Sequence, residues 1–127
     1  MNNVAWFNKY IGKKWDLNNY NCWGLVRDVY KQELGLDLPQ YRVENNSYQC
    51  FSFLIQHVTE RNNWFEVRFP KTFDLLLFWS NIPIHIGVYD KKRNGVIHAT
   101  ERSGVIFQRL QLPGLTQWQK IQLLRRK

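Results

Sequence analysis

The sequence predicts an α+β domain in which N-terminal helices pack on a central antiparallel β-sheet. Apolar residues recur at helical spacing in the first half of the chain, whereas alternating or continuous apolar runs typical of strands fill the second half. With 127 residues, 44% of them apolar and 16% aromatic, the chain is long enough for one core and too apolar for a disordered tail. We therefore expect a single domain over residues 1–127.

Three helices are predicted in the first half of the chain. Trp6–Tyr10 is predicted as a short helix, which the following glycine-containing segment interrupts. Cys22–Leu34 carries its apolar residues on one face, and Gly35 follows where a helix often ends in left-handed backbone. Ser47–Glu60 is predicted as a helix because its apolar side chains again recur at helical spacing.

Strand patterns begin at Trp64. The expected strands are Trp64–Phe69, Phe73–Trp79, Ile84–Tyr89, Val96–Ala99 and Gly104–Leu110. The dipeptide Asn94-Gly95 stands between the third and the fourth, and Asn-Gly is a frequent hairpin turn. These two strands should therefore pair directly in an antiparallel sheet.

The chain is basic, with 18 Lys and Arg against 10 Asp and Glu and a net charge of +8. Such a charge favours acidic partners, for example an anionic cell-wall polymer or the acidic surface of a protein assembly. Nucleic acid is not favoured, because the basic residues are dispersed and no nucleic-acid-binding motif accompanies them. A basic surface that only aids solubility explains the same charge.

Several other classes of site lack their sequence signals. The Cys and His residues are not spaced as zinc ligands, and there is no glycine-rich phosphate loop, so we expect neither metal nor cofactor. The first residues lack a signal peptide, and no apolar window is long enough to cross a membrane. We therefore expect the chain to be made and folded in a cytoplasm, without membrane insertion.

Cys22 is the strongest candidate nucleophile, because it stands where a polar loop gives way to a predicted helix. The first turn of a helix offers unpaired N–H groups and the positive end of the helix dipole, which favour a thiolate and an oxyanion. The other cysteine, Cys50, lies among apolar residues and is expected to pack in the core, and His57 on the same helix is expected near the surface.

His85 and His98 are the candidate partners of Cys22. If they lie on paired strands, the two side chains come within hydrogen-bonding reach, so that one ring orients the other. A nucleophilic thiol needs a base, and the base needs a partner that fixes its tautomer. The alternative from local chemistry is a buried cysteine with two structural histidines.

Three motifs, in order, resemble those of the NlpC-type cysteine peptidases, papain-like enzymes that cut peptide bonds in bacterial peptidoglycan. They are Asn21–Val26 (Asn-Cys-Trp-Gly-Leu-Val), Phe73–Phe78 (Phe-Asp-Leu-Leu-Leu-Phe), and His85–Tyr89 with the subsequent Ile97–Ala99. The resemblance implies a papain-like NlpC fold with Cys22 as nucleophile, His85 as base and His98 as the residue that orients it. It also implies that Trp15 and Trp23 line the substrate side of the cleft.

The segment from Cys22 to Pro39 is more similar to the peptidases of long-tailed phage tail tips than to secreted wall hydrolases. This similarity implies an endopeptidase acting on a peptidoglycan stem peptide and other tail-tip proteins as partners. The protein would reside in the host cytoplasm during assembly and then at the virion tail tip, where it would open the wall. Two alternatives remain: a structural tail-tip protein without activity, and an amidase or acyltransferase using the same Cys and His residues.

Overall fold

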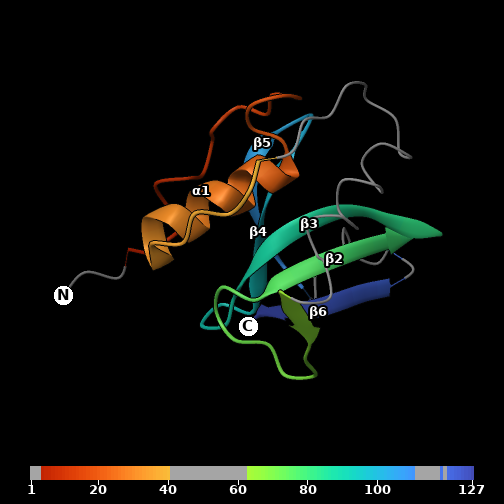
Figure 1. Cartoon of the computed structure of the whole chain (residues 1–127). Coiled ribbons are helices and arrows are strands. Elements are labelled where there is room, and N and C mark those ends of the chain that lie inside the picture. The colour runs from red at the N-terminus through yellow and green to blue at the C-terminus, as the bar shows by residue number, and fades with distance from the viewer. Residues whose placement is uncertain (1–3, 41–62, 111–117, 119) are drawn as a thin grey trace.

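The computed structural model describes residues 4–40, 63–110, 118 and 120–127. Within these residues it contains one α-helix and one antiparallel six-stranded sheet (Figure 1), which confirms the predicted α+β class. The elements are α1 (Cys22–Leu34), β1 (Trp64–Glu66), β2 (Leu75–Ser80), β3 (Ile82–Asp90), β4 (Gly95–Thr100), β5 (Gly104–Arg109) and β6 (Lys120–Arg126). The helix predicted over Ser47–Glu60, with Cys50 and His57, lies outside the described residues.

The strand order is β1-β6-β2-β3-β4-β5, so the last strand of the chain lies inside the sheet, between β1 and β2. β6 is not predicted from the sequence, because most of its residues are only partly buried and it ends in two arginines. Arg125 holds this strand in place, since its Nε and Nη2 lie 3.0 and 2.8 Å from the two carboxylate oxygens of the buried Asp74. The bidentate ion pair joins β6 to the start of β2.

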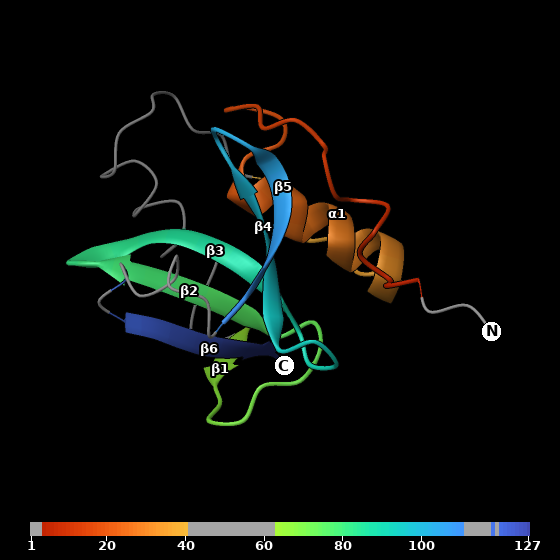
Figure 2. The ribbon, with the colours of Figure 1, turned by 180° about the vertical axis from the view of Figure 1, so that it is seen from behind.

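The β4–β5 hairpin crosses the rest of the sheet at a steep angle (Figure 2). β3 has nine residues, but its pairing with β4 extends only from Val88–Ile97 to Asp90–Gly95. Its pairing with β2 runs along the strand as far as Ile82. The edges of β3 and β4 therefore separate beyond Val88, which leaves backbone groups of β3 available to another element.

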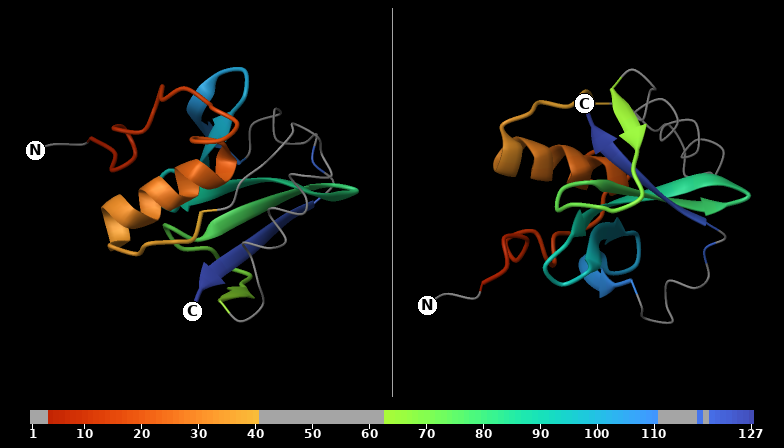
Figure 3. Two further views of the ribbon diagram at one scale, coloured as in Figure 1. Left: turned by 45° about the horizontal axis from the view of Figure 1, so that its top comes forward. Right: turned by 90° about the horizontal axis from the view of Figure 1, so that it is seen from below.

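α1 lies against one face of the sheet and packs on β3 and β4 (Figure 3). Its N-cap is Asn21, whose Oδ1 accepts from the N–H of Gly24 at 2.9 Å while its Nδ2 donates to the Leu17 carbonyl. The helix ends at Gly35, which has a φ of 66° and so confirms the predicted left-handed stop. Both ends of the predicted helix were therefore correct.

The prediction of a helix over Trp6–Tyr10 was wrong. This segment forms consecutive turns, in which the N–H of Asn8 bonds to the Ala5 carbonyl and that of Tyr10 to the Phe7 carbonyl. These bonds span three residues rather than four, and Gly12, two residues after the segment, has a φ of 88°. The turns place both Phe7 and Tyr10 in the core. A helix of only five residues has little stability of its own, so burial of these two side chains decides the local conformation.

The strand predictions differ from the structure mainly at their ends. β1 stops at Glu66, and Phe69, expected in the same strand, is 81% exposed. Phe73 precedes β2 with a φ of 80°, so the strand begins at Leu75, two residues later than predicted. The predicted Asn94-Gly95 turn is confirmed, since Asn94 has a φ of 50° and β4 starts at Gly95.

Alternation along the strands divides the buried side chains into two clusters. The cluster beneath α1 includes Cys22 together with Leu75 and Leu77 of β2, Ile86 and Val88 of β3, and Ile97 and Ala99 of β4. The cluster on the opposite face includes Leu76, Phe78, Tyr89 and Val96, with Trp118, Ile121 and Leu123 packed against it. Among the described residues, no helix has the length and apolar character needed to span a membrane.

Candidate active site

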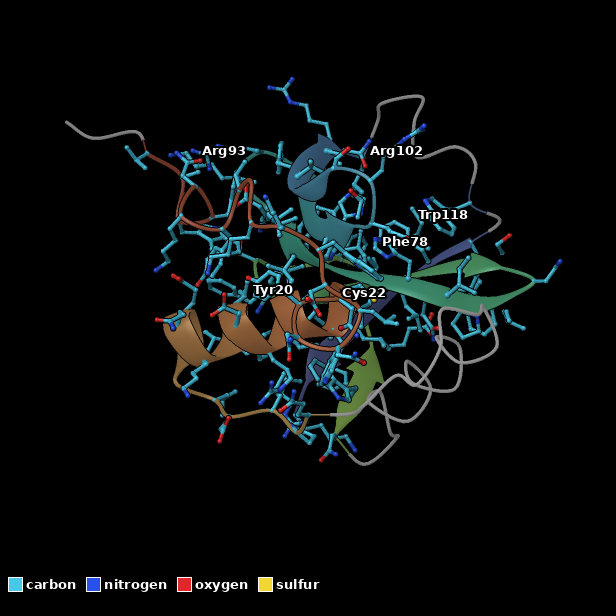
Figure 4. The ribbon with its side chains drawn as sticks, turned by 90° about the horizontal axis from the view of Figure 1, so that it is seen from above. Tyr20, Cys22, Phe78, Arg93, Arg102 and Trp118 are labelled. Atoms are coloured by element: carbon cyan, nitrogen blue, oxygen red, sulfur yellow. The ribbon has the colours of Figure 1, made fainter. Side chains whose placement is uncertain are left out.

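Cys22 is the first residue of α1 and is only 3% exposed. Its sulfur lies within reach of the backbone N–H of Ile86, and the N–H groups of Trp23 and of Cys22 itself also act on the sulfur so as to favour its charged form. Figure 4 shows Cys22 at the end of α1 beside β3, with Phe78 and Trp118 labelled on the other side of that strand. The helix start therefore brings the thiol to the residue that directly follows His85.

The N–H of Ile86 is available to the thiol because β3 and β4 have separated at this point. Tyr89 directs its backbone N–H and carbonyl to the β2 side, where they bond to Asp74 and Phe73. Successive residues of a strand direct these groups to opposite edges, so Ile86 directs its N–H toward β4. The paired register of β3 with β4 ends at Val88, before Ile86 is reached. The thiol thus occupies a place that a strand partner would otherwise fill.

Burial raises the pKa of the Cys22 thiol to about 11, although the three backbone N–H groups act in the opposite direction. The helix start favours ionisation as expected, but burial outweighs this effect in the resting protein. Removing a thiolate from water costs hydration free energy. The backbone N–H groups of the first helical turn and of Ile86 offset only part of this cost. Cys22 is a neutral thiol at neutral pH and needs a base when it reacts.

His85 and His98 are hydrogen-bonded to each other, with His85 Nε2 and His98 Nδ1 2.7 Å apart. The predicted proximity of the two rings is confirmed. Gly87 makes it possible, because a Cβ at that position would lie 3.0 Å from the Cβ of His98 and 2.5 Å from Val96 Cγ2. Alternation places both histidines on the face of Phe78, whose ring centroid lies 5.3 Å from that of His85 and 6.0 Å from that of His98.

The nucleophile and the histidines therefore come from opposite faces of the sheet. Cys22 belongs to the cluster under α1, whereas the histidine rings contact Phe78 in the other cluster. They approach each other where β3 and β4 separate, because the sulfur bonds to the N–H of the residue next to His85. A fully paired β3–β4 ladder would have separated them by a layer of backbone.

Both rings are neutral at neutral pH. Burial, followed by the neighbouring His98, holds the pKa of His85 well below its usual value. Burial also lowers the pKa of His98, and the hydrogen bond that His98 donates to Gln108 acts in the opposite direction. A neutral imidazole has one nitrogen without a proton, which is the form that accepts a proton from a thiol.

Two residues near the histidines were not singled out from the sequence. Gln108 on β5 has its Oε1 2.6 Å from His98 Nε2. Trp118 stacks on His85, with the ring planes at 9° and the centroids 6.0 Å apart. Alternation along Gly104–Arg109 would have placed Gln108 on the face of His98, but the sequence alone does not give the register between β4 and β5.

The two tryptophans expected at the substrate side lie in different environments. Trp15 is partly buried against the cluster under α1. Trp23 is 2% exposed, and its indole N–H donates to the Pro39 carbonyl at 2.8 Å. In this position Trp23 is a core residue and presents no surface to a substrate. In the described part of the chain, no group of three or more His, Cys, Asp or Glu side chains is arranged to hold a metal ion.

Comparison with known proteins gives a family and a fold. The family model described as "NlpC/P60 family" matches residues 9–124. A crystal structure of the NlpC/p60 domain of the peptidoglycan hydrolase SagA superposes with a TM-score of 0.58 at 21% sequence identity, covering 91% of this chain and 89% of that one. No curated protein sequence matches the chain significantly.

Proposed function

The chain belongs to the NlpC/P60 family, and on that basis we propose that it is a cysteine peptidase that cleaves peptide bonds in bacterial peptidoglycan. The observation that carries this proposal is the placement of Cys22 at the start of α1 with its sulfur bonded to the N–H of Ile86, next to a hydrogen-bonded histidine pair. The similarity to the SagA domain, which comes from a peptidoglycan hydrolase, agrees with a cell-wall substrate.

The proposed reaction is acyl transfer through a thioester. His85 takes the proton of the Cys22 thiol as the sulfur attacks the carbonyl carbon of the peptide bond. The tetrahedral intermediate collapses when the C–N bond breaks, and protonated His85 gives its proton to the leaving amine. Water, deprotonated by His85, then hydrolyses the thioester and regenerates the thiol. His98 holds the ring of His85 through the 2.7 Å hydrogen bond.

Backbone N–H groups at the start of α1 are the proposed oxyanion donors. The N–H groups of Cys22 and Trp23 lie close enough to the sulfur to favour its charged form, and a bound peptide would develop charge on its carbonyl oxygen beside them. Asn21 supports them without introducing a negative charge, because it caps the helix with a neutral amide. A neutral cap keeps repulsion away from both the thiolate and the oxyanion.

The biological setting that we propose is a phage or prophage tail tip. It rests on the sequence resemblance of residues 22–39 to tail-tip peptidases. In that setting the substrate is a peptidoglycan stem peptide, the partners are other tail-tip proteins, and the enzyme opens the host wall locally. Mass spectrometry of purified particles tests this part: the protein should be recovered in the tail fraction, and its absence there would leave only the peptidase proposal.

The peptidase proposal is tested by incubating purified peptidoglycan with the wild-type protein, Cys22→Ala and Cys50→Ala under reducing conditions, followed by mass spectrometry of the released fragments. Wild type and Cys50→Ala should release stem-peptide fragments with new amino and carboxyl ends, whereas Cys22→Ala should release none above background. Circular dichroism of all three proteins excludes misfolding as the cause. Release by Cys22→Ala at the wild-type rate would refute the assignment of the nucleophile.

A structural tail-tip protein without activity is the second candidate, and the burial of Cys22 favours it. At 3% exposure the sulfur meets a substrate only after neighbouring side chains have moved. The same assay distinguishes the two functions. An inert but folded wild-type protein that is still incorporated into tails would support the structural function and contradict the peptidase.

A further inference from the structure

The hydrogen-bonded chain of side chains does not end at His98. His98 on β4 is paired with Ile106 on β5, and Gln108 lies two residues farther along β5, on the same face. On the neighbouring strand, an extension of the β3–β4 register by one pair places Gly87 opposite His98, with His85 two residues away on the same face. The three side chains thus form a diagonal row across β3, β4 and β5.

Two short hydrogen bonds connect this row. His85 Nε2 lies 2.7 Å from His98 Nδ1, and His98 Nε2 lies 2.6 Å from Gln108 Oε1. The last of these atoms is an amide oxygen, which accepts hydrogen bonds and donates none. Its partner, His98 Nε2, must therefore carry the proton.

The position of that proton determines all the others in the row. A neutral His98 that is protonated on Nε2 has a bare Nδ1, which accepts from His85. His85 then carries its proton on Nε2, and its Nδ1 is left bare. Because Nε2 of His85 is occupied by His98, the bare Nδ1 is the nitrogen that remains to take a proton from a thiol. If His98 were protonated on Nδ1 instead, it would donate to Nε2 of His85. His85 would then carry its own proton on Nδ1 and could not act as the base.

We propose that Gln108 is a positioning residue that sets the tautomers of both histidines, so that His85 is held in the form able to deprotonate Cys22. Gln108 acts through its hydrogen bond with His98. The inference rests on the proposed peptidase function for its biological consequence. The tautomers themselves are a property of the folded protein and are measurable without any substrate.

The direct test is nitrogen NMR of protein labelled with ¹⁵N in histidine only, at a pH above 7, where both rings are neutral. Each ring nitrogen shows whether it is protonated through its chemical shift and its couplings to the ring protons. The wild-type spectrum should show Nε2–H and bare Nδ1 for both His85 and His98. A wild-type His85 protonated on Nδ1 would overturn the proposal, whatever the protein's activity.

Three variants extend the test. Gln108→Leu removes the acceptor at similar size, and it should give a mixture of tautomers at both rings. Gln108→Glu keeps an acceptor oxygen and should preserve the wild-type tautomers. Gln40→Leu, the same change at an exposed position outside the helices and strands, should alter nothing. Unchanged tautomers in a folded Gln108→Leu protein would overturn the proposal.

Hydrolysis of peptidoglycan fragments gives the second readout. For Gln108→Leu, kcat should fall about threefold to tenfold, the equivalent of one ordinary hydrogen bond, while KM stays constant. Gln108→Glu should restore most of the rate, a rescue that a merely structural role would not produce. The failures are distinguishable: an inert wild type with the expected tautomers refutes the peptidase alone, whereas an active Gln108→Leu with wild-type kcat refutes the role of Gln108 alone.

Discussion

Gly87→Ala should uncouple the two histidines while leaving the fold in place. The added Cβ would lie 2.5 Å from Val96 Cγ2 and 3.0 Å from both the His98 Cβ and the Ile97 carbonyl oxygen. Val96 is fully buried, and the other two atoms belong to or adjoin the backbone, so β4 itself must move by a few tenths of an ångström. Overpacking of this kind costs about 1–3 kcal/mol of folding free energy.

The same displacement acts on the 2.7 Å hydrogen bond between His85 and His98, because the Cβ of His98 is one of the atoms pushed away. Loss of that bond should lower kcat about fivefold, since one hydrogen bond is equivalent to about 1 kcal/mol. The assays are denaturant unfolding, histidine ¹⁵N spectra and peptidoglycan hydrolysis.

Val29→Ala is the matched control for Gly87→Ala. Val29 is a fully buried residue of α1, and its truncation should cost about 2 kcal/mol by loss of packing without moving β4. The control should therefore lose stability and keep its kcat. If Gly87→Ala also keeps both its kcat and its imidazole spectrum while losing the expected stability, the reasoning about β3 and β4 is refuted.

Three further predictions concern the start of α1. The rate of Cys22 alkylation in the folded protein should be slow at pH 7 and rise with pH up to about 11, because the raised pKa keeps the thiol protonated below that pH. Mass spectrometry measures this rate, and a plateau below pH 8 would contradict the raised pKa. Trp23→Phe should lower the free energy of unfolding by about 1–3 kcal/mol, because the hydrogen bond to the Pro39 carbonyl and core volume are lost. KM should not change, and a rise in KM at constant stability would instead make Trp23 a substrate-binding residue. Asn21→Asp should destabilise the protein by about 1–3 kcal/mol in urea titrations, because a buried carboxylate cannot donate to the Leu17 carbonyl. Equal stability of the two proteins would show that the hydrogen bond from Asn21 to Leu17 is dispensable.

The predictions that succeeded depended on local signals. Asn21, Gly35 and the apolar face between them fix α1 through capping and spacing, and the structure has its ends where they were expected. Asn94-Gly95 likewise fixes the hairpin between β3 and β4, since positive φ at Asn94 is a local requirement of the turn. Trp6–Tyr10 failed because five residues are too few for helical spacing to outweigh the gain from burying Phe7 and Tyr10.

The sequence by itself determined the chemistry that the site contains: a cysteine at a helix start and two histidines on strands joined by a tight turn. Only the tertiary structure decided how these groups meet. Separation of β3 from β4 beyond Val88 frees the N–H of Ile86 for the Cys22 sulfur, and burial at that place keeps the thiol protonated. The register of β5 brings Gln108 to His98. Strand separation, desolvation and register arise from contacts between segments far apart in the chain, so no local pattern of residues encodes them.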